Sequence, residues 1–214
     1  MKPESPPKND ALVAIYADES CLGNGREGEN PGGVGVLLEF RQREAVPLVR
    51  RDLWISEPAT TNNRMALRSV IESMTALGRK GRRFRVSFTT DSRYIVDGMT
   101  IWVHDWARRG WTRKSGPIEN LELWRQAVEA AAAHLVQWRW VRGHAGHAQN
   151  EYANDLAVRA AGAQSSSGGL VESGFDAWLA ERATKARPTA LEPFPDSTGF
   201  RASRPLPSAH PTSH

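Results

Sequence analysis

VRGHAGHAQNEYANDLA, residues 141–157, is the stretch that decides the fold and the chemistry of this 214-residue chain. A strand is expected just before it, and a helix is expected to open at about Asn150. Between them, Gly143 and Gly146 flank His144 in a loop with little side-chain bulk to bury it. A lone histidine is more often structural, but a mobile imidazole titrates near neutral pH and suits proton transfer. The loop is therefore a candidate catalytic segment.

Two other short stretches place an aspartate directly after an apolar run. YADES, residues 16–20, contains Asp18, and TTDSR, residues 89–93, contains Asp91. An aspartate at a strand end often only caps a turn or a helix. Open α/β sheets, however, gather their sites at the carboxyl ends of strands. Because both aspartates occur together with the histidine loop, we expect them to share a site with His144.

The order of the expected elements indicates the fold class. Strands are expected at residues 12–16, 32–38, 49–55, 84–89 and 138–141, and helices at residues 65–77, 94–106, 119–134 and from about 150 onward. Three strands, a helix, a strand, two helices, a strand and a last helix indicate an α/β domain with a mixed sheet.

Composition divides the chain into one domain and two tails. Residues 1–10 are polar and proline-bearing and are expected to form a flexible leader, and residues 11–162 are expected to form the domain. Residues 163–214 are rich in Ser, Gly and Pro and show little periodicity. This tail is expected to be mostly disordered, with one short helix at residues 175–182 as its only candidate element.

Charge and cysteine content narrow the class of protein. The formal net charge is +4, and cations concentrate at residues 79–85 and 106–114, the second run interleaved with tryptophan. The single cysteine, Cys21, excludes an internal disulfide and fits a reducing compartment. No apolar run approaches the roughly 18 residues that a membrane span needs, and the N-terminus is polar. We therefore expect a monomer in the cytoplasm with no membrane partner.

Taken together with TTNNRM, residues 60–65, these stretches resemble the type 1 ribonuclease H family, in its bacterial ribonuclease HI form, over roughly residues 11–160. The resemblance implies a ribonuclease H-like fold, α/β with a mixed five-stranded sheet flanked by helices. It also implies a metal-dependent endonuclease that hydrolyses the RNA strand of an RNA–DNA hybrid, with Mg²⁺ or Mn²⁺ as cofactor. By the same resemblance, Asp18 and Asp91 bind the metal and His144 shuttles a proton.

Two positions depart from the family pattern, which has four carboxylates. Ala66 stands where the family has a glutamate after Asn-Asn-Arg-Met, and Asn154 stands where it has an aspartate. Asp155 comes one residue late, about 100° round the helix, and so cannot replace the missing group. Asn154 keeps a carbonyl oxygen that can coordinate weakly, whereas Ala66 offers nothing. Since Mg²⁺ commonly binds through one or two carboxylates plus phosphates and waters, Asp18 and Asp91 are expected to hold one ion well and a second one poorly.

Glu19 is a third departure, because the family usually has a glycine beside the first aspartate. It restores a negative charge, although strand alternation would point it away from Asp18 unless the strand ends there. Two alternatives stay open for Glu19, a metal ligand and a solvated turn residue. Glu151, one helical turn before Asn154, is a weaker candidate for the same role.

The resemblance also implies contacts to the nucleic acid. The polar run at residues 61–63 is either a helix N-cap or a reader of minor-groove edges and 2′-hydroxyls. Trp102 and Trp106 have the spacing of core residues, and the cations that follow them are expected to track phosphates. The expected substrate-binding residues are Cys21, Asn24, Thr61, Asn62, Asn63, Arg93, Arg108, Arg109, Arg113 and Lys114.

The sequence therefore favours a ribonuclease H over two alternatives. One is a catalytically reduced protein of the same fold that only binds RNA–DNA hybrids, and the other is a nuclease for another nucleic acid. A pure binder has no need of the intact aspartate pair and histidine loop, which favours the enzyme. The expected catalytic residues are Asp18, Asp91, His144 and Asn154, and the expected metal ligands are Asp18, Asp91 and Asn154, with Glu19 as a further candidate.

Overall fold

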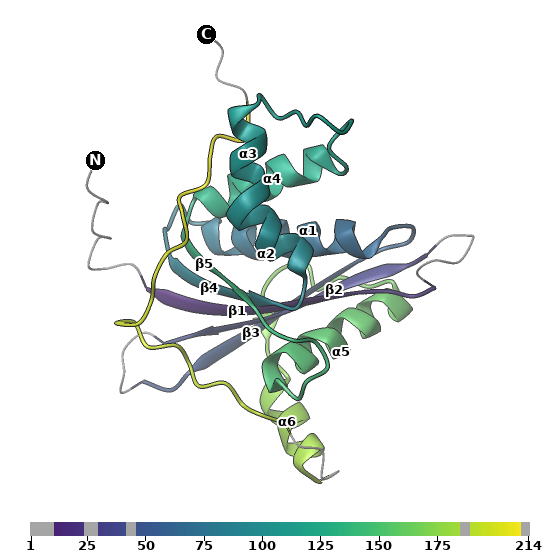
Figure 1. The fold of residues 1–214 in the computed structure, drawn as a ribbon. Coiled ribbons are helices and arrows are strands. Elements are labelled where there is room, and N and C mark those ends of the chain that lie inside the picture. The colour runs from purple at the N-terminus through teal and green to yellow at the C-terminus, as the bar shows by residue number, and fades with distance from the viewer. Residues whose placement is uncertain (1–10, 24–29, 42–45, 185–188, 211–214) are drawn as a thin grey trace.

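A mixed six-stranded sheet forms the centre of the computed structural model, which describes residues 11–23, 30–41, 46–184 and 189–210 (Figure 1). The strands lie in the order β5-β4-β1-β2-β3-β6. β1 pairs in parallel with β4, and β4 with β5, whereas the other neighbours are antiparallel. The strand bounds are β1 (Leu12–Cys21), β2 (Gly32–Phe40), β3 (Val49–Glu57), β4 (Arg85–Thr90), β5 (Leu135–Trp140) and β6 (Val171–Glu172).

Helices cover both faces of this sheet. The first four α-helices lie on one face, with α1 and α4 packed together, and α5 lies on the other face (Figure 1). The helix bounds are α1 (Asn62–Gly78), α2 (Arg93–Asp97), the π-helical turn η1 (Gly98–Trp102), α3 (Val103–Arg108), α4 (Leu121–Ala132), α5 (Ala148–Ala163) and α6 (Phe175–Thr184).

β1 is the central strand, and its side chains alternate between two hydrophobic cores. Val13 and Ile15 join the core on the side of α1 and α4, whereas Ala14 and Tyr16 join the core on the side of α5. A strand buried on both faces explains why its sequence is a continuous apolar run. The same alternation places the side chains of successive residues at the end of β1 on opposite faces.

A glycine on β2 lets α5 approach the sheet. A Cβ at Gly35 would lie only 2.0 Å from the carbonyl oxygen of Ala153 in α5. Gly35 is also the register partner of Asp18 across β1 and β2. The missing side chain therefore brings α5, which carries Asn154, against the strand that carries Asp18.

Replacing this glycine tests the close approach. Gly35→Ala is expected to lower the free energy of unfolding by about 1–3 kcal/mol, the usual cost of forcing an extra methyl into a packed core. Gly162→Ala is the matched control, because a Cβ there meets only the Leu22 side chain, at 4.0 Å. In α5 that change is expected to add up to about 1 kcal/mol through helix propensity. Urea denaturation of both variants measures the difference, and equal stabilities would contradict the packing described.

The structure corrects two details of the predicted fold. The prediction of a five-stranded sheet was wrong by one strand, because β6 has only two residues and so carries no readable alternation. The single helix expected at residues 94–106 is instead α2, η1 and α3 in succession. At the start of η1, a Cβ on Gly98 would lie 1.9 Å from the Trp124 ring, so the indole packs directly on the helix backbone. The remaining strands and helices follow the predicted order.

The C-terminal segment differs from the expectation of a mostly disordered tail over the residues that the structure describes. α6 packs against α5 through Phe175, which is buried and whose ring lies 5.2 Å from that of Tyr152. Further on, Ser203 donates its backbone N–H to Val136 at the free edge of β5, at 2.8 Å. The Trp111 indole donates to Ser208 at 3.1 Å. Single anchoring residues of this kind produce no hydrophobic period, which is why composition favoured disorder.

Candidate active site

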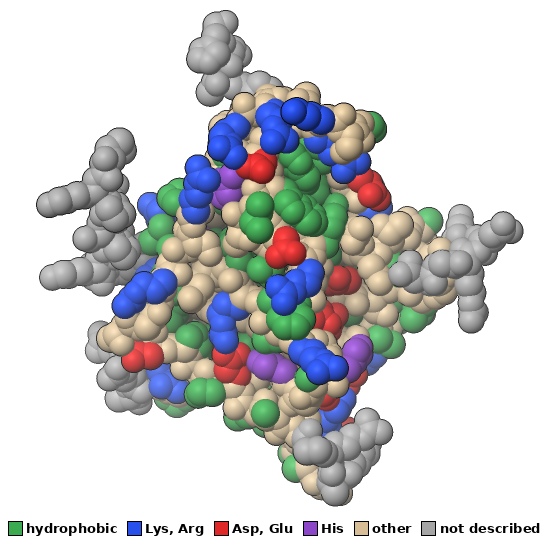
Figure 2. Space-filling view, in the orientation of Figure 1, with side chains coloured by type: hydrophobic (Ala, Val, Ile, Leu, Met, Phe, Trp, Pro, Cys, Tyr) green, Lys and Arg blue, Asp and Glu red, His purple; other side chains and the backbone are tan. Residues whose placement is uncertain are grey.

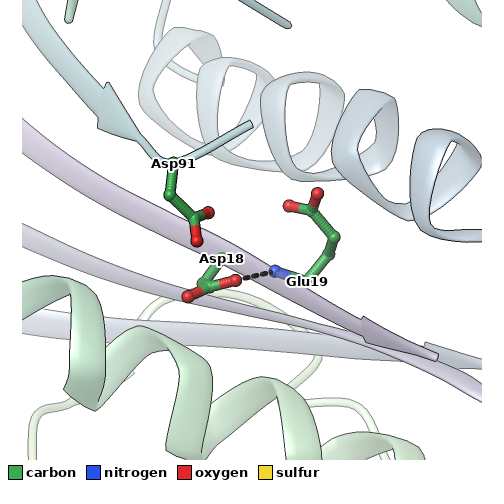
Figure 3. Close-up of side chains that lie close together, drawn as sticks. All are labelled: Asp18, Glu19 and Asp91. Carbon is green, nitrogen blue, oxygen red and sulfur yellow. Dashed lines mark hydrogen bonds between the residues drawn. The ribbon is translucent and has the colours of Figure 1, made fainter. Parts of the chain in front are cut away.

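Three carboxylates gather where β1 passes the end of β4. In the parallel pairing of these strands Ala17 is opposite Thr90, so Asp91, the next residue, lies beside Asp18. One carboxylate oxygen from each of Asp18, Glu19 and Asp91 lies within 4.8 Å of the others (Figure 3). The cluster draws on two strands whose residues are some seventy positions apart, and sheet register alone brings them together.

Glu19 reaches this cluster without any break in the strand. β1 continues to Cys21, so Asp18 and Glu19 point to opposite faces, Asp18 toward α5 and Glu19 toward α1 (Figure 3). The longer glutamate side chain still brings its oxygen to the shared site. α1 is also the helix that carries Ala66, which is fully buried. A carboxylate from β1 thus reaches the site, whereas Ala66 of α1 offers none.

Hydrogen bonds fix Asp18 and leave one oxygen of Glu19 without a partner. Asp18 accepts from the Glu19 backbone N–H at 2.7 Å and from the side-chain amide of Asn150 at 3.1 Å. Asn150 is buried, and sequence reasoning had placed it only at the start of a helix. Among the described residues, Oε2 of Glu19 is buried with no hydrogen-bond partner. A buried carboxylate oxygen that lacks a donor is suited to a cation.

Burial raises the pKa values of the three carboxylates, and mutual repulsion raises those of Asp18 and Glu19 further. Burial raises the pKa of Asp18 to about 8, and the negative charge of Asp91 is the second-largest cause of this shift. Burial, Asp18 and Asp91 raise the pKa of Glu19 well above its usual value, against a hydrogen bond with Ser92. Burial raises the pKa of Asp91 too, opposed by a backbone hydrogen bond and by His144. Hard divalent cations take oxygen ligands and favour ionised carboxylates, so the donor set fits Mg²⁺ or Mn²⁺.

These raised pKa values set an expected pH dependence for the metal-free protein. Neutral Asp18 is favoured in the fold, so its stabilising contribution is complete below its ordinary pKa of 3.8 and is lost as the pH rises through about 8. In EDTA, Asp18→Asn is therefore expected to raise the Tm at pH 9 by roughly 3 °C or more and to change it little at pH 4. Thermal unfolding at both values measures this, and Mg²⁺ should reduce the difference at pH 9. An equal shift at pH 4 and 9 would contradict the cluster's electrostatics.

The histidine loop closes over the cluster from the end of β5. A Cβ at Gly143 would lie 2.1 Å from Oδ2 of Asp91, so only a glycine allows the loop this close. His144 is exposed and has a φ of 52°, a left-handed conformation that costs free energy in a residue other than glycine. Close by, His147 caps α5, accepting from the backbone N–H of Asn150 at 3.3 Å. His147 is therefore a structural histidine, whereas the His144 imidazole makes no hydrogen bond among those found for the described residues.

Three polar residues of α5, Glu151, Asn154 and Asp155, have different surroundings. Asn154 is half-buried and lines a cavity of about 760 Å³ together with His144. Asp155 instead accepts from the Trp178 indole at 2.7 Å, on another side of the helix. Glu151, the weaker candidate, accepts from the Gly146 backbone N–H at 3.0 Å and so holds the loop. Glu151 lines the same cavity, but its two carboxylate oxygens are engaged by Gly146 and Arg182.

The expected groove residues lie at the end of β1 and the start of α1. Thr61 is the N-cap of α1 and accepts from the Arg64 backbone N–H at 3.3 Å, so the capping alternative holds for it. Asn62 and Asn63 follow in the first turn and are half-buried, and Oδ1 of Asn62 is buried without a partner among the described residues. Cys21 is half-buried at the end of β1. Asn24 lies outside the described residues.

A cation and an aromatic ring sit beside the carboxylates on the other side. Arg93 is exposed, and its guanidinium lies 3.9 Å from the centre of the Trp140 ring. The Trp140 indole in turn donates to the backbone oxygen of Asp91 at 2.9 Å. Sequence reasoning assigned Trp140 only to a strand. Its exposed ring gives the site a flat apolar surface next to Asp91.

The expected basic run forms an exposed surface above the sheet. Figure 2 shows Lys and Arg side chains gathered over the top of the molecule, where α3 and the loop after it lie. Trp102 and Trp106 pack against the core as their spacing indicated, and Trp111 is buried as well. Arg108 forms an ion pair with Asp105. The four exposed cations of this surface are Arg108, Arg109, Arg113 and Lys114.

Comparison with known proteins identifies the family of the chain. The RNase H family model matches residues 10–162. Ribonuclease H of Erythrobacter litoralis is 46% identical over 154 residues, which cover 72% of this chain and 98% of that protein. Ribonuclease H of Neisseria gonorrhoeae is 43% identical over 153 residues, or 71% and 97% of the two chains.

The chain belongs to the ribonuclease H family. Ribonucleases H are metal-dependent endonucleases that hydrolyse the RNA strand of RNA–DNA hybrids, so the predicted family, fold and activity are confirmed. The crystal structure of LC9-RNase H1 is similar, with 68% identity and a TM-score of 0.89 over 96% of this chain and 97% of that one. That protein is described as a type 1 RNase H with the type 2 active-site motif. In the described part of this ribonuclease H chain, no helix is long and apolar enough to span a membrane.

Proposed function

We propose that this protein hydrolyses the RNA strand of RNA–DNA hybrids with Mg²⁺ or Mn²⁺ held by Asp18, Glu19 and Asp91. The observation that carries the proposal is the compact cluster of these three carboxylates, in which Glu19 keeps a buried oxygen without a partner. Glu19 would take the place of the glutamate that the family carries on α1. The altered active-site motif in the name of LC9-RNase H1 supports this assignment, because that protein is 68% identical to this chain.

The ligand set is unequal. Asp18 and Asp91 are the principal ligands, since both sit at the junction of β1 and β4. Asn154 of α5, which lines the cavity beside His144, has a neutral carbonyl oxygen and would be a weakened ligand. Divalent ions in such a cluster would activate water and stabilise the charge that builds on the attacking and leaving oxygens. Burial and mutual repulsion raise the pKa values of Asp18 and Glu19, so the positive charge of such ions would favour the ionised carboxylates.

His144 would carry the proton of the reaction. Its imidazole is exposed on a loop whose neighbour, Gly143, touches Asp91. From there a ring nitrogen can give a proton to the departing 3′ oxygen and take one from water for the next cycle. His144 has a left-handed backbone, with a φ of 52°, and lines the cavity beside Asn154.

Two surfaces would select the substrate. Asn62 and Asn63 present neutral amides that suit minor-groove edges and 2′-hydroxyls, and Thr61 and Cys21 would contribute to the same groove. Asn24, which lies outside the described residues, would be a further contact. Arg93 and the exposed cations Arg108, Arg109, Arg113 and Lys114 would contact phosphates and make binding salt-dependent. We also propose a monomer in the cytoplasm, a reducing compartment that suits the single cysteine.

Substrate preference tests the proposal. The purified protein, given labelled RNA–DNA hybrid, duplex RNA and duplex DNA in Mg²⁺, Mn²⁺ or EDTA, is expected to cut only the RNA strand of the hybrid and only with metal. Hybrid binding should weaken steeply between about 50 and 200 mM salt. Equal affinity for hybrid and duplex DNA at about 0.15 M salt would count against hybrid recognition.

A further inference from the structure

The segment that follows the family region contacts the histidine loop from two sides. The family model ends at residue 162, whereas α6 and residues 189–192 lie beyond it. Both pieces pack beside the cavity that His144 and Asn154 line, and Arg182, Thr189 and Ala190 form part of its wall. Segments far along the chain thus meet next to the proposed catalytic residues.

The backbone at residue 190 binds the end of the loop directly. Ala190 donates its N–H to the carbonyl oxygen of Gly146 at 2.6 Å and accepts from the N–H of Ala148 at 3.0 Å. These two bonds form a short parallel bridge between His147 and Ala190. The carbonyl and the amide on either side of His147 are therefore fixed by a residue from outside the family region.

A side chain from α6 holds the other polar group of Gly146. Glu151 accepts the Gly146 N–H with one carboxylate oxygen, and its other oxygen forms an ion pair with Arg182. Both side chains are at least four-fifths buried, with 17% and 16% exposed. Arg182 also lies 3.6 Å from Asp155 and 4.5 Å from the centre of the Trp178 ring. Arg182 therefore holds the Glu151 carboxylate, which in turn holds the His144 loop at Gly146.

A second carboxylate in the tail holds the histidine that caps α5. Glu192 lies 2.9 Å from Nε2 of His147 and 2.5 Å from the guanidinium of Arg139 in β5. Its backbone N–H and C=O bond with the side chain of Gln149, at 3.1 and 2.7 Å. Glu192 therefore connects the last strand, the cap of α5 and the tail at one point.

This arrangement matters because the loop conformation is strained. A histidine in the left-handed region persists only where its surroundings impose it, and His144 makes no hydrogen bond of its own among those found for the described residues. Gly146, two residues on, has both its backbone groups bonded, one through Glu151 and one through Ala190. The contacts that can impose the conformation thus include the tail.

We infer that Arg182, Ala190 and Glu192 act as positioning residues that hold the His144 loop in its catalytic geometry. The inference rests on the proposed role of His144 as proton carrier. It assigns the C-terminal segment a part in the reaction: without these contacts His144 samples positions away from the departing oxygen, although the metal-binding carboxylates are untouched.

The test is a double-mutant cycle with His144. Arg182→Met and Glu192→Gln are each expected to lower kcat for hybrid cleavage about 10-fold or more, with little change in KM, the scale seen when a supporting residue of an active site is removed. In a His144→Ala background the same changes should have almost no further effect, because the group that they position is gone. Arg201→Met and Glu172→Gln are matched controls, exposed tail residues away from the loop, and should leave kcat unchanged.

Two kinetic results would overturn the inference. One is an equal loss of kcat with and without His144, which would indicate a general loss of structure; the other is unchanged kcat in both variants. Hydrogen–deuterium exchange of residues 142–149 gives a readout that needs no activity. Arg182→Met should speed exchange there while thermal unfolding stays cooperative, and unchanged exchange would also reject the inference. Absence of cleavage by the natural chain, with faster exchange in the variant, would reject the proposed function and leave the positioning contacts supported.

Discussion

Asp18→Asn and Asp91→Asn are each expected to lower the rate of hybrid cleavage by at least about 100-fold, the scale of removing one preorganised charged group from an active site. Each change takes a negative ligand from a cluster whose oxygens lie within 4.8 Å of one another. Asn150 can still bond to an asparagine at position 18, so the fold is expected to survive. Affinity for the hybrid should stay nearly the same, because the exposed cations and the groove amides are unchanged.

Single-turnover cleavage in Mg²⁺ and fluorescence anisotropy of a labelled hybrid in EDTA measure the two effects separately. Asp97→Asn, on α2 and outside the cluster, is the matched control and should cleave normally. Full activity in either cluster variant would mean that any cleavage seen comes from another site or from a contaminant.

Glu19→Gln is expected to be as damaging as the loss of an aspartate, again by about 100-fold or more. The reason is geometric: Glu19 supplies the only carboxylate that the described structure places on the α1 side of the site, since Ala66 of α1 has none. Glu19→Gly should be equally severe, because it removes the side chain that replaces the missing glutamate.

Placing a carboxylate on α1 at position 66 tests whether Glu19 replaces the glutamate that the family carries there. Ala66→Glu in the natural background adds a surplus carboxylate to an already crowded cluster, so activity should change little or fall. The pair Glu19→Gly and Ala66→Glu should recover activity relative to Glu19→Gly alone, because one carboxylate substitutes for the other and the two effects are not additive. Glu72→Gln, an outer residue of α1, controls for charge on that helix. Normal cleavage by Glu19→Gly would reject Glu19 as a ligand.

Much of the fold and the centre of the site can be predicted from the sequence, for a physical reason. Asp18 and Asp91 end apolar runs, and strand ends in an α/β sheet converge. The glycines around His144 indicate a loop that lies close to another part of the chain. In the structure, a Cβ at Gly143 would clash with the Asp91 side chain. At these positions the local sequence pattern and the sheet topology indicate the same arrangement, so the local pattern is sufficient to predict it.

Other parts of the site depend on distances that no local pattern contains. Alternation correctly gives the face on which Glu19 lies, but whether its side chain reaches the metal site depends on the spacing of β1 and β4. Asn150 reads as an ordinary first-turn residue, and only the close packing of α5 on β2 brings it to Asp18.

The contacts of the tail were the hardest to anticipate. Arg182 and Glu192 pair with residues 31 and 45 positions earlier, and neither belongs to an apolar period. Their segment has the composition of a disordered tail, and its order comes from single buried anchors such as Phe175. Composition measures the average of a segment, whereas a few specific contacts decide where it lies.

The rate of hybrid cleavage as a function of Mg²⁺ and Mn²⁺ concentration tests the central claim most directly. The natural chain and the Ala66→Glu, Asn154→Asp double variant should be compared on one labelled hybrid, with EDTA as the zero-metal point. The three carboxylates and Asn154 are expected to support metal-dependent cleavage of the RNA strand by the natural chain, at metal concentrations similar to or higher than the variant requires. No metal-dependent cleavage by the natural chain, with strong cleavage by the double variant, would contradict the account and indicate a hybrid-binding protein that has lost its catalysis.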